Sequence, residues 1–501
     1  MRFVIASLAF ALSASAAAAE TCGNTADGFK PFIQQMKQEA AAAGVSKRSI
    51  AVLDTVTYDT AIIKRDRGQS IFSDSFLTFQ KKMISAGRLA RAKSQIEKYQ
   101  DVFDRVQKQY GVPPPVIAAF WALETDFGAV TGDFPTIQSI ATLAWDCRRP
   151  EKFRPQLIAS LQLLDKGDLT LAEFKGAWAG EIGQTQFMAY DYNESAVDYD
   201  GDGKRDLRNS VPDVIASTAN LLRKHGWEPN QPWIQEVKVP AQLPWKEADI
   251  AIKHPRSQWA KWGVTAVSGN PIKADTMEAS LLLPMGRNGP AFLAYHNFTK
   301  AYLKWNESLV YSLTAAYLAT RIAGAPPVSP GRAPVNHPTY EKIVELQTKL
   351  EGLGYDVGKL DGKIGKGTRL AVKDQQMKLN LPADSYPSVE VIAAILKSNV
   401  HGHLPPEATQ PDSDMDQDQE TQQQPVQPVQ QPVQKPKPLK PAKQAVQPEP
   451  PQEPEQLETS DGSTLPDLPA EGPIPSKKTK KKAVILPESA DQGTSEGDSL
   501  Y

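Results

Sequence analysis

Glu124 is the side chain best suited to proton transfer. It ends an apolar and aromatic run within 111–128 that opens with prolines suited to a first helical turn. Ile117, Phe120 and Trp121 lie seven, four and three residues earlier, so a helix places them on the same face. An apolar face disfavours a charged carboxylate and raises its pKa. The pattern predicts a general acid. A glutamate that pairs with an arginine at a helix end is the alternative.

A second segment, 180–192, places glycine, amide and aromatic residues close together. Glycines let a ligand approach the backbone, and amides such as Gln186 bond hydroxyl and acetamido groups. Aromatic side chains such as Phe187 stack on sugar rings. The segment therefore favours a carbohydrate site.

The stretch 198–206 has the spacing of a calcium-binding loop. Carboxylates stand at positions 1, 3, 5 and 9, with glycine at position 6: Asp198, Asp200, Asp202 and Asp206. The carbonyl of Lys204 is available as a ligand, and position 12 is Asn209 instead of the usual glutamate. Asp213 is the candidate for the missing carboxylate. We expect a structural Ca²⁺ and no organic cofactor; a metal-free Asp/Gly-rich turn is the alternative.

Most of the remaining periodicity is helical. Val116, Phe120 and Leu123 are spaced as on one helix face, and a similar spacing recurs from Leu157 to Leu164. About 300 residues, 20–324, can bury a large core. We therefore expect a mainly α domain with few short strands.

The N-terminus reads as an export signal. Residues 1–19 have a basic start, a short apolar run and small residues before Glu20, which is typical of a cleaved signal peptide. An uncleaved anchor is the alternative. No other run approaches the roughly 18 to 20 apolar residues of a spanning helix, so we expect a periplasmic chain without a transmembrane anchor. Export makes a disulfide between Cys22 and Cys147 plausible, with two separate thiols as the alternative.

The chain after residue 324 divides into three parts. A proline-rich linker, 325–338, precedes a compact unit of apolar helical spacing, 339–400. The region 401–501 is rich in Pro, Gln and Lys and lacks the apolar surface that folding requires, so it is predicted to be disordered. Its lysine cluster, 477–482, is either a contact for anionic wall polymer or lipid, or a solvated charge run.

The overall charge excludes one class of partner. Lysine and arginine number 56 against 58 acidic residues, so no net basic field favours nucleic acid.

Several ordered blocks resemble the soluble lytic transglycosylases of the membrane-bound type B family. The resemblance runs from about Phe29 to Ile322 and rests on these blocks: Trp121-Ala-Leu-Glu-Thr-Asp-Phe-Gly128, Gly183-Gln-Thr-Gln-Phe-Met188, Ala196-Val-Asp-Tyr-Asp-Gly-Asp-Gly203, Ala219-Asn-Leu-Leu-Arg-Lys-His-Gly-Trp227, Ala294-Tyr-His-Asn-Phe298 and Trp305-Asn-Glu-Ser308. It implies a lysozyme-like fold. The unit 339–400 resembles the three-helix peptidoglycan-binding domain, and a small helical packing domain without ligand is its alternative.

The resemblance implies a role for each matched residue. Glu124 takes the place of the catalytic glutamate and Gln186 that of a sugar-binding glutamine. The remaining residues implied in substrate binding are Phe187, Met188, Tyr295, Asn297, Tyr311 and the groove-bordering pair Arg148 and Arg149, for which a surface charge pair is the alternative. The family also carries a calcium loop at 198–206, although this chain has one extra residue before Asp213.

The implied reaction cleaves the β-1,4 bond between N-acetylmuramic acid and N-acetylglucosamine in peptidoglycan. Glu124 acts first as acid and then as base, and a 1,6-anhydromuramoyl end forms without water. A hydrolytic muramidase and a non-catalytic peptidoglycan-binding protein are the alternatives. Glycan strands are the expected partner, and other cell-wall enzymes are candidate partners of the tail.

Overall fold

The structure is a computed structural model and describes residues 22–68 and 74–402. The predicted signal peptide, 1–19, lies outside these ranges, as does the predicted tail apart from residues 401 and 402, so both stay predictions. Within the described residues, no helix has the length and apolar character needed to cross a bilayer.

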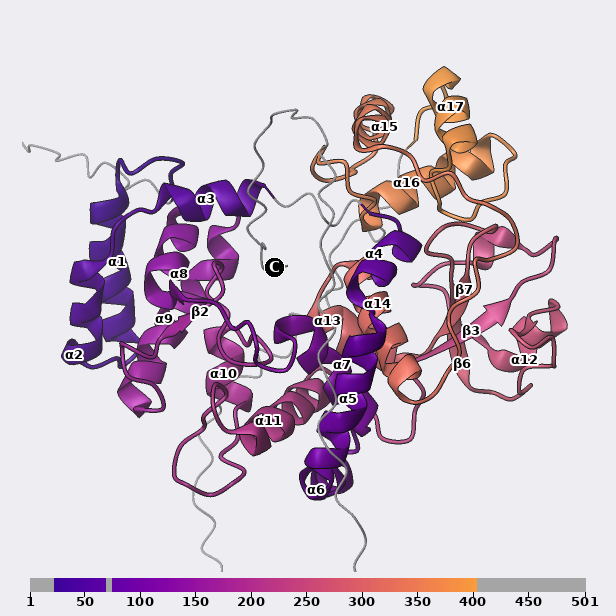
Figure 1. Ribbon diagram of the computed structural model, residues 1–501. Coiled ribbons are helices and arrows are strands. Elements are labelled where there is room, and N and C mark those ends of the chain that lie inside the picture. The colour runs from indigo at the N-terminus through magenta and orange to yellow at the C-terminus, as the bar shows by residue number, and fades with distance from the viewer. Residues whose placement is uncertain (1–21, 69–73, 403–501) are drawn as a thin grey trace, which may run out of the picture. The chain divides into compact units, whose positions relative to one another are not determined.

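One group of helices packs around α8 (Thr136–Trp145) and α9 (Pro150–Lys166) (Figure 1). The first residue of α9 is a proline, and the helix ends at Gly167 in the left-handed conformation, as favoured at these two positions. The other members are α1 (Phe29–Ala42), α2 (Lys47–Ile50), the 3-10 helix η1 (Ala51–Thr55), α3 (Thr60–Arg67) and α10 (Ala189–Ser195). Their apolar faces form one continuous core.

A second group surrounds α7 (Pro114–Thr125), which packs along α14 (Leu309–Ile322). Every residue of α7 from Val116 to Thr125 is buried, as expected for a helix that is apolar on all sides. The other members are α4 (Phe76–Met83), α5 (Ala86–Lys98), α6 (Gln100–Tyr110), α11 (Val211–Lys224), the π-helical turn η4 (Phe298–Tyr302) and α13 (Leu303–Trp305). The residue that ends α7 therefore lies deep in the molecule.

An antiparallel sheet of order β4-β6-β7-β3-β5 adjoins the second group. Its strands are β3 (Ile234–Lys238), β4 (His254–Pro255), β5 (Thr265–Ala266), β6 (Glu278–Leu282) and β7 (Ala291–Ala294), with η3 (Trp245–Glu247) and α12 (Arg256–Lys261) nearby in the chain. Phe292 faces the helical core and Leu293 a separate core, so β7 is apolar throughout. A two-stranded sheet pairs β1 (Phe134–Pro135) with β2 (Lys175–Gly176).

The C-terminal unit consists of α15 (Tyr340–Gly352), α16 (Lys366–Lys378) and α17 (Val389–Lys397) around a small core of its own. It also contacts the residues next to the five-stranded sheet. Lys373 Nζ lies 3.0 Å from Asp249 Oδ2, and Arg369 donates to the carbonyl of Pro284 at 3.0 Å.

A disulfide joins Cys22 and Cys147, whose Cα atoms are 5.0 Å apart. Beside it, Gly23 pairs with Asp146, and the N–H of Gly23 donates to the carbonyl of Trp145 at 2.9 Å. Together these contacts form a clasp between residues 22–23 and the end of α8.

The prediction of a mainly helical fold with few short strands is confirmed. The prediction that the leucines from Leu157 to Leu164 share one buried helix face is confirmed only in part. Leu157, Leu161 and Leu163 are buried in the core, whereas Leu164 is only partly buried at its edge.

Candidate active site

Glu124 lies in the last turn of α7, and its side chain is 8% exposed. Its Oε1 accepts one hydrogen bond from the indole N–H of Trp305 at 2.9 Å and another from the hydroxyl of Tyr311. The indole is fixed by stacking on Phe120, with ring centroids 4.2 Å apart. The carboxyl is therefore oriented by two donors from α13 and α14.

The surroundings place the pKa of Glu124 close to neutral. Burial is the largest influence and raises this pKa from its ordinary value of 4.5 to about 7. The hydrogen bonds from Tyr311 and Trp305 lower the pKa, and the nearby charge of Glu181 raises it. A carboxyl with such a pKa can give up a proton and take one back near neutral pH.

Asp126, two residues further on, serves the structure of the helix end. It ends α7 with a left-handed backbone, φ 51°, which aspartate tolerates better than most side chains. Its carboxylate forms ion pairs with Arg88, at 3.3 Å, and with Arg91. Asp126 thus pairs with α5. Glu124, and not Asp126, is the carboxyl that accepts hydrogen bonds from Trp305 and Tyr311.

The loop 176–188 is held against the end of α7. Gln184 accepts a hydrogen bond from the indole N–H of Trp121 at 2.8 Å, and Thr125 donates its hydroxyl to the carbonyl of Gln184 at 2.6 Å. Gly183 has a positive φ, and a Cβ at this position would lie 2.6 Å from the carbonyl oxygen of Leu207. Glycine is therefore required for the loop to close.

Gln186 occupies the turn of this loop with a left-handed φ of 51°. Its Nε2 donates to the carbonyl of Gly183 at 2.7 Å, while its Oε1 is buried without a partner. Phe187 is buried edge-on to Trp305, with centroids 5.9 Å apart, and Met188 follows as the partly exposed cap of α10. The loop is thus linked to the site through both α7 and Trp305.

Arg148 and Arg149 are held from α3. Both guanidinium groups form ion pairs with the buried carboxylate of Asp66, at 2.5 Å from Arg148. Arg149 also lies over the ring of Phe153, with the guanidinium carbon 5.0 Å from the centroid. Because both arginines pair with Asp66, their guanidinium groups are held in place, although each side chain remains partly exposed.

Tyr295 and Asn297 lie outside this hydrogen-bond network. Tyr295 is 1% exposed, and its hydroxyl donates to Gln235 at 2.7 Å. Asn297 is fully buried and bonds the backbone of Glu228 and Gln231 at 2.7–2.9 Å. Of Tyr295, Asn297 and Tyr311, which were expected to bind substrate, only Tyr311 forms a hydrogen bond with Glu124.

Two residues of the site were not assigned a role from the sequence. Trp305 is the first residue of one of the matched blocks, so its indole N–H could have been predicted as a hydrogen-bond donor at the site. Glu181 lies in the segment 180–192, and its influence on Glu124 depends on how that loop folds.

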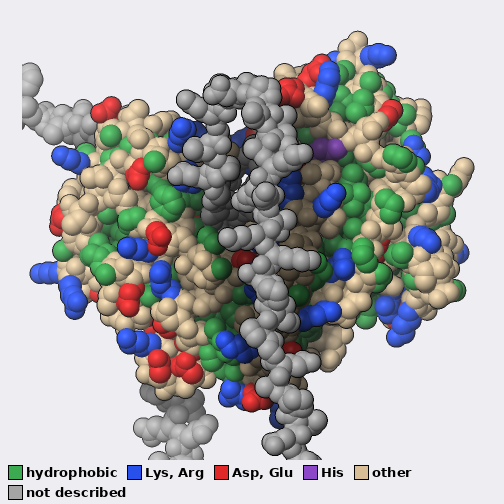
Figure 2. Space-filling model, viewed as in Figure 1, with side chains coloured by type: hydrophobic (Ala, Val, Ile, Leu, Met, Phe, Trp, Pro, Cys, Tyr) green, Lys and Arg blue, Asp and Glu red, His purple; other side chains and the backbone are tan. Residues whose placement is uncertain are grey.

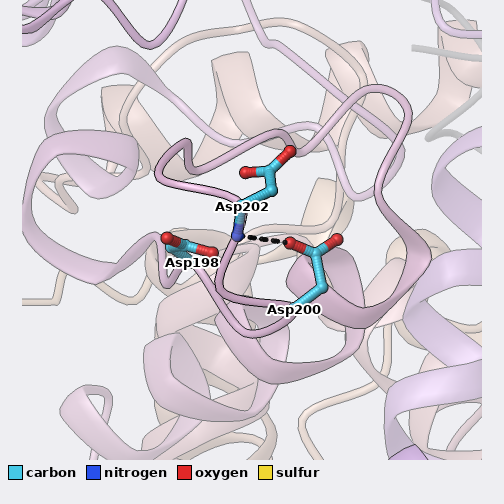
Figure 3. Close-up of side chains that lie close together, drawn as sticks. All are labelled: Asp198, Asp200 and Asp202. Atoms are coloured by element: carbon cyan, nitrogen blue, oxygen red, sulfur yellow. Dashed lines mark hydrogen bonds between the residues drawn. The ribbon is translucent and has the colours of Figure 1, made fainter.

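The predicted metal loop gathers three carboxylates (Figure 3). One oxygen from each of Asp198, Asp200 and Asp202 lies within 4.8 Å of the others. Figure 2 shows acidic side chains close together over this loop, between α10 and α11. Like charges at such distances repel each other, and hard oxygen donors suit calcium, so these three residues fit the ion.

The other predicted metal ligands differ in position. Asp213 is buried in the first turn of α11, and its carboxylate accepts the backbone N–H of Tyr199 at 2.7 Å and that of Asp206 at 2.8 Å. Asp213 therefore hydrogen-bonds the backbone of the loop, and it is not one of the three clustered carboxylates. Asp206 accepts N–H groups from residues 208 and 209 and does not belong to the three-carboxylate cluster.

Two family patterns match the chain. The transglycosylase SLT domain matches residues 28–320, and the putative peptidoglycan binding domain matches residues 339–395. Among curated proteins, the chain is 29% identical over 296 residues to the membrane-bound lytic murein transglycosylase B of Escherichia coli (strain K12). That match covers 58% of this chain and 79% of the relative.

Solved structures give the same assignment. SltB3 from Pseudomonas aeruginosa, in complex with NAG-anhNAM-pentapeptide, matches with a TM-score of 0.68 and 35% identity, over 74% of this chain and 100% of that chain. The Escherichia coli lytic transglycosylase Slt35 in complex with calcium matches with a TM-score of 0.51 and 27% identity, over 58% of this chain and 93% of that chain.

Proposed function

Because the chain belongs to the transglycosylase SLT family, we propose that Glu124 is the single acid and base with which it cleaves peptidoglycan. The chain is a peptidoglycan lytic transglycosylase. The observation that carries the role of Glu124 is a buried carboxyl whose pKa is raised to about 7 and whose Oε1 is occupied by two donors.

In the first step the neutral carboxyl acts as the acid. Oε1 already accepts from Trp305 and Tyr311, so the acidic proton resides on Oε2. Oε2 transfers this proton to the oxygen that bridges N-acetylmuramic acid and N-acetylglucosamine, and the bond from this oxygen to muramyl C1 breaks. The same two donors then stabilise the carboxylate that has formed.

In the second step this carboxylate acts as the base. It takes the proton of the muramyl C6 hydroxyl, and the C6 oxygen closes on C1 to give the 1,6-anhydro ring. Glu124 regains its proton and no water is consumed. One carboxyl therefore suffices for both proton transfers.

Residues on both sides of Glu124 are proposed to bind the glycan. The unpartnered Oε1 of Gln186 is available to a sugar hydroxyl or N–H, and the exposed parts of Arg148 and Arg149 suit acidic groups of the peptide stem. For Tyr295 and Asn297 we propose a structural role, since both are buried and bonded elsewhere.

The test is digestion of purified sacculi by wild type and by Glu124→Gln, with products analysed by mass. Wild type should release anhydro ends, and the variant should lose activity by about 10²–10⁴-fold because an amide cannot transfer the proton. Glu97→Gln, on the exposed side of α5, is the matched control. Products heavier by one water would identify a muramidase, and no products from a folded wild type would identify a binding protein. Activity retained by Glu124→Gln would refute the assignment.

We further propose that the loop 198–206 binds a structural Ca²⁺. Asp198, Asp200 and Asp202 supply carboxylates, and the relative Slt35 is reported in complex with calcium. The ion would neutralise their mutual repulsion and order the connection between α10 and α11. It takes no part in the proton transfers.

The unit 339–400 is proposed to hold the enzyme on the wall. A pocket of about 620 Å³, lined by residues of α15 together with Leu353 and Leu396, is a candidate for the binding face. We propose that the catalytic domain spans residues 20–324, the linker 325–338 and the peptidoglycan-binding domain 339–400.

A cleaved signal peptide, 1–19, would deliver the chain to the periplasm. The substrate and the disulfide both suit that compartment. The mass of the mature protein tests this proposal, since cleavage places Glu20 at the N-terminus.

A further inference from the structure

The turn that carries Gln186 begins directly after Glu181. Ile182 and Phe187 exchange two backbone hydrogen bonds, at 2.8 and 2.9 Å, and both side chains are buried in a core. Met188, which follows Phe187, packs against the same core as a partly buried side chain, whereas Glu181, which precedes Ile182, is a partly exposed carboxyl at the start of the turn.

The carboxyl of Glu181 has an unused acceptor. Its Oε2 is buried and has no hydrogen-bond partner, although the residue as a whole is partly exposed. The Oε1 of Gln186, on the same loop, is likewise buried and unpartnered. Two unpartnered acceptors on one loop carry a free-energy cost that a ligand rich in N–H and O–H donors would remove.

The charges around Glu181 come from two helices. Glu124 faces it from α7, and Arg149 and Lys152 face it from the beginning of α9. Burial raises the pKa of Glu181, whereas its own backbone N–H, the two cations and the backbone N–H of Ala179 lower it. Among the described residues no cation lies within ion-pair distance of Glu181, and its Oε2 has no hydrogen-bond partner, so this oxygen is available to a ligand.

Resting on the proposed role of Glu124, we propose that Glu181 is a second functional carboxyl of the site: its Oε2 accepts a hydrogen bond from the saccharide bound beside Glu124, and its charge keeps the proton on Glu124. The natural donors on this saccharide are the acetamido N–H and the ring hydroxyls. A single side chain thereby helps both to position the sugar and to hold the acid in its active form.

The electrostatic half of this proposal has a definite sign. The negative charge of Glu181 raises the pKa of Glu124. The acid form of Glu124 starts the reaction, so activity falls as pH rises through that pKa. Removing the charge lowers the pKa and moves the alkaline fall of kcat/KM to lower pH.

Two conservative variants of the full-length protein separate the two roles. Glu181→Gln keeps the length of the side chain and an acceptor oxygen but loses the charge, so the alkaline limb should move to lower pH with little change in KM. Glu181→Asp keeps the charge but withdraws the acceptor by one methylene. It should keep the limb near its wild-type pH and raise KM by about three- to tenfold, the value of one hydrogen bond.

The assay follows release of anhydro ends from soluble, uncrosslinked glycan strands across pH, with Glu97→Gln as the exposed control. Thermal unfolding establishes that each variant is folded, and if Glu181→Gln is not folded, Glu181→Ala, which also lacks the charge, replaces it in the measurement of the pH limb. A wild-type pH limb in folded Glu181→Gln, or a wild-type KM in Glu181→Asp, overturns the corresponding half of the proposal. Neither result affects Glu124, whose role fails only if Glu124→Gln stays active.

Discussion

The two donors on Oε1 of Glu124 oppose the effect of its burial. Burial favours the neutral acid, whereas the hydroxyl of Tyr311 and the indole of Trp305 favour the carboxylate. Burial is the stronger influence, so the resting group is poised near neutral pH. In the proposed mechanism, the donors prevent the pKa of Glu124 from rising so far that the second, basic step would fail.

Tyr311→Phe removes one of these donors and should raise the pKa of Glu124. The alkaline limb of the pH profile should then move to higher pH, opposite to the shift expected for Glu181→Gln. We also expect kcat to fall by about tenfold, since a hydrogen bond to a charged group is lost. The measurement is the pH dependence of anhydro-end release.

Tyr302→Phe is the matched control for this prediction. Tyr302 is buried beside Phe120, and its hydroxyl has no hydrogen-bond partner. Its loss should leave the limb in place. An unchanged limb in Tyr311→Phe as well would show that this hydroxyl does not act on Glu124.

Glu124 should also reduce stability at alkaline pH. A carboxyl whose pKa is higher in the folded state stabilises folding below its ordinary pKa of 4.5, and this contribution is lost as pH rises through about 7. Glu124→Gln should therefore be more stable than wild type at pH 8 by about 1–3 kcal/mol and nearly equal to it near pH 4.5. Urea unfolding at both pH values measures this difference. If the difference in unfolding free energy between the two proteins is the same at both pH values, ionisation of Glu124 is not its cause.

Much of the residue-level chemistry could be predicted from local sequence. The apolar run before Glu124 correctly indicated a buried carboxyl. Trp305 and Tyr311 lie about 180 residues away, so spacing alone could not show that both donate to Oε1. Family resemblance pointed to Tyr311 but also to Tyr295 and Asn297, whose burial only the folded chain shows.

The loop between α10 and α11 is the element with the clearest metal dependence. Chelation of calcium should lower the melting temperature of wild type, since an ion bound only to the folded state stabilises it by about 2.7 kcal/mol at a hundred times its Kd. Asp200→Asn keeps an acceptor for the backbone N–H of Asp202 but loses a charge at the site. Its melting temperature should respond weakly to chelation.

Asp104→Asn, at an exposed position on α6, is the control and should respond like wild type. Equal melting temperatures of wild type with chelator and with added calcium would argue against a bound ion.

Helices were easier to predict than strands. Proline at the start of α7 and an unbroken apolar run define that helix locally. β7 has four residues and is buried on both faces, so it lacks the alternation that marks a half-exposed strand. Its pairing with β3 joins segments more than 50 residues apart, which no local pattern indicates.

At the scale of the whole molecule, the Cys22–Cys147 disulfide closes a loop of 125 residues. Reduction should lower the stability of wild type by about 2–4 kcal/mol because the unfolded chain gains freedom. Thermal unfolding with and without dithiothreitol measures the loss. Cys22→Ser should start from the lower value and not respond to the reductant, and an equal response by both proteins would exclude the clasp as the cause.

The division into two structured parts follows from composition, but their contact does not. The prolines of 325–338 and the helical spacing after Thr339 predict a separate unit. The insertion of Arg369 and Lys373 beside the sheet depends on side chains meeting across the fold. These contacts attach the unit to the region around Pro284 and Asp249, so the linker is not the sole connection between the two parts.

The clasp also has a consequence for how the protein is made. Cys22 precedes Cys147 by 125 residues, so the covalent link can form only after the intervening helices have been synthesised and the chain has met an oxidant. Arg148, for which we propose a role in glycan binding, follows the second cysteine directly, so the redox state of the two cysteines bears on the backbone next to this residue. Preparations from reducing and oxidising compartments would share one amino-acid sequence and yet differ by two hydrogen atoms.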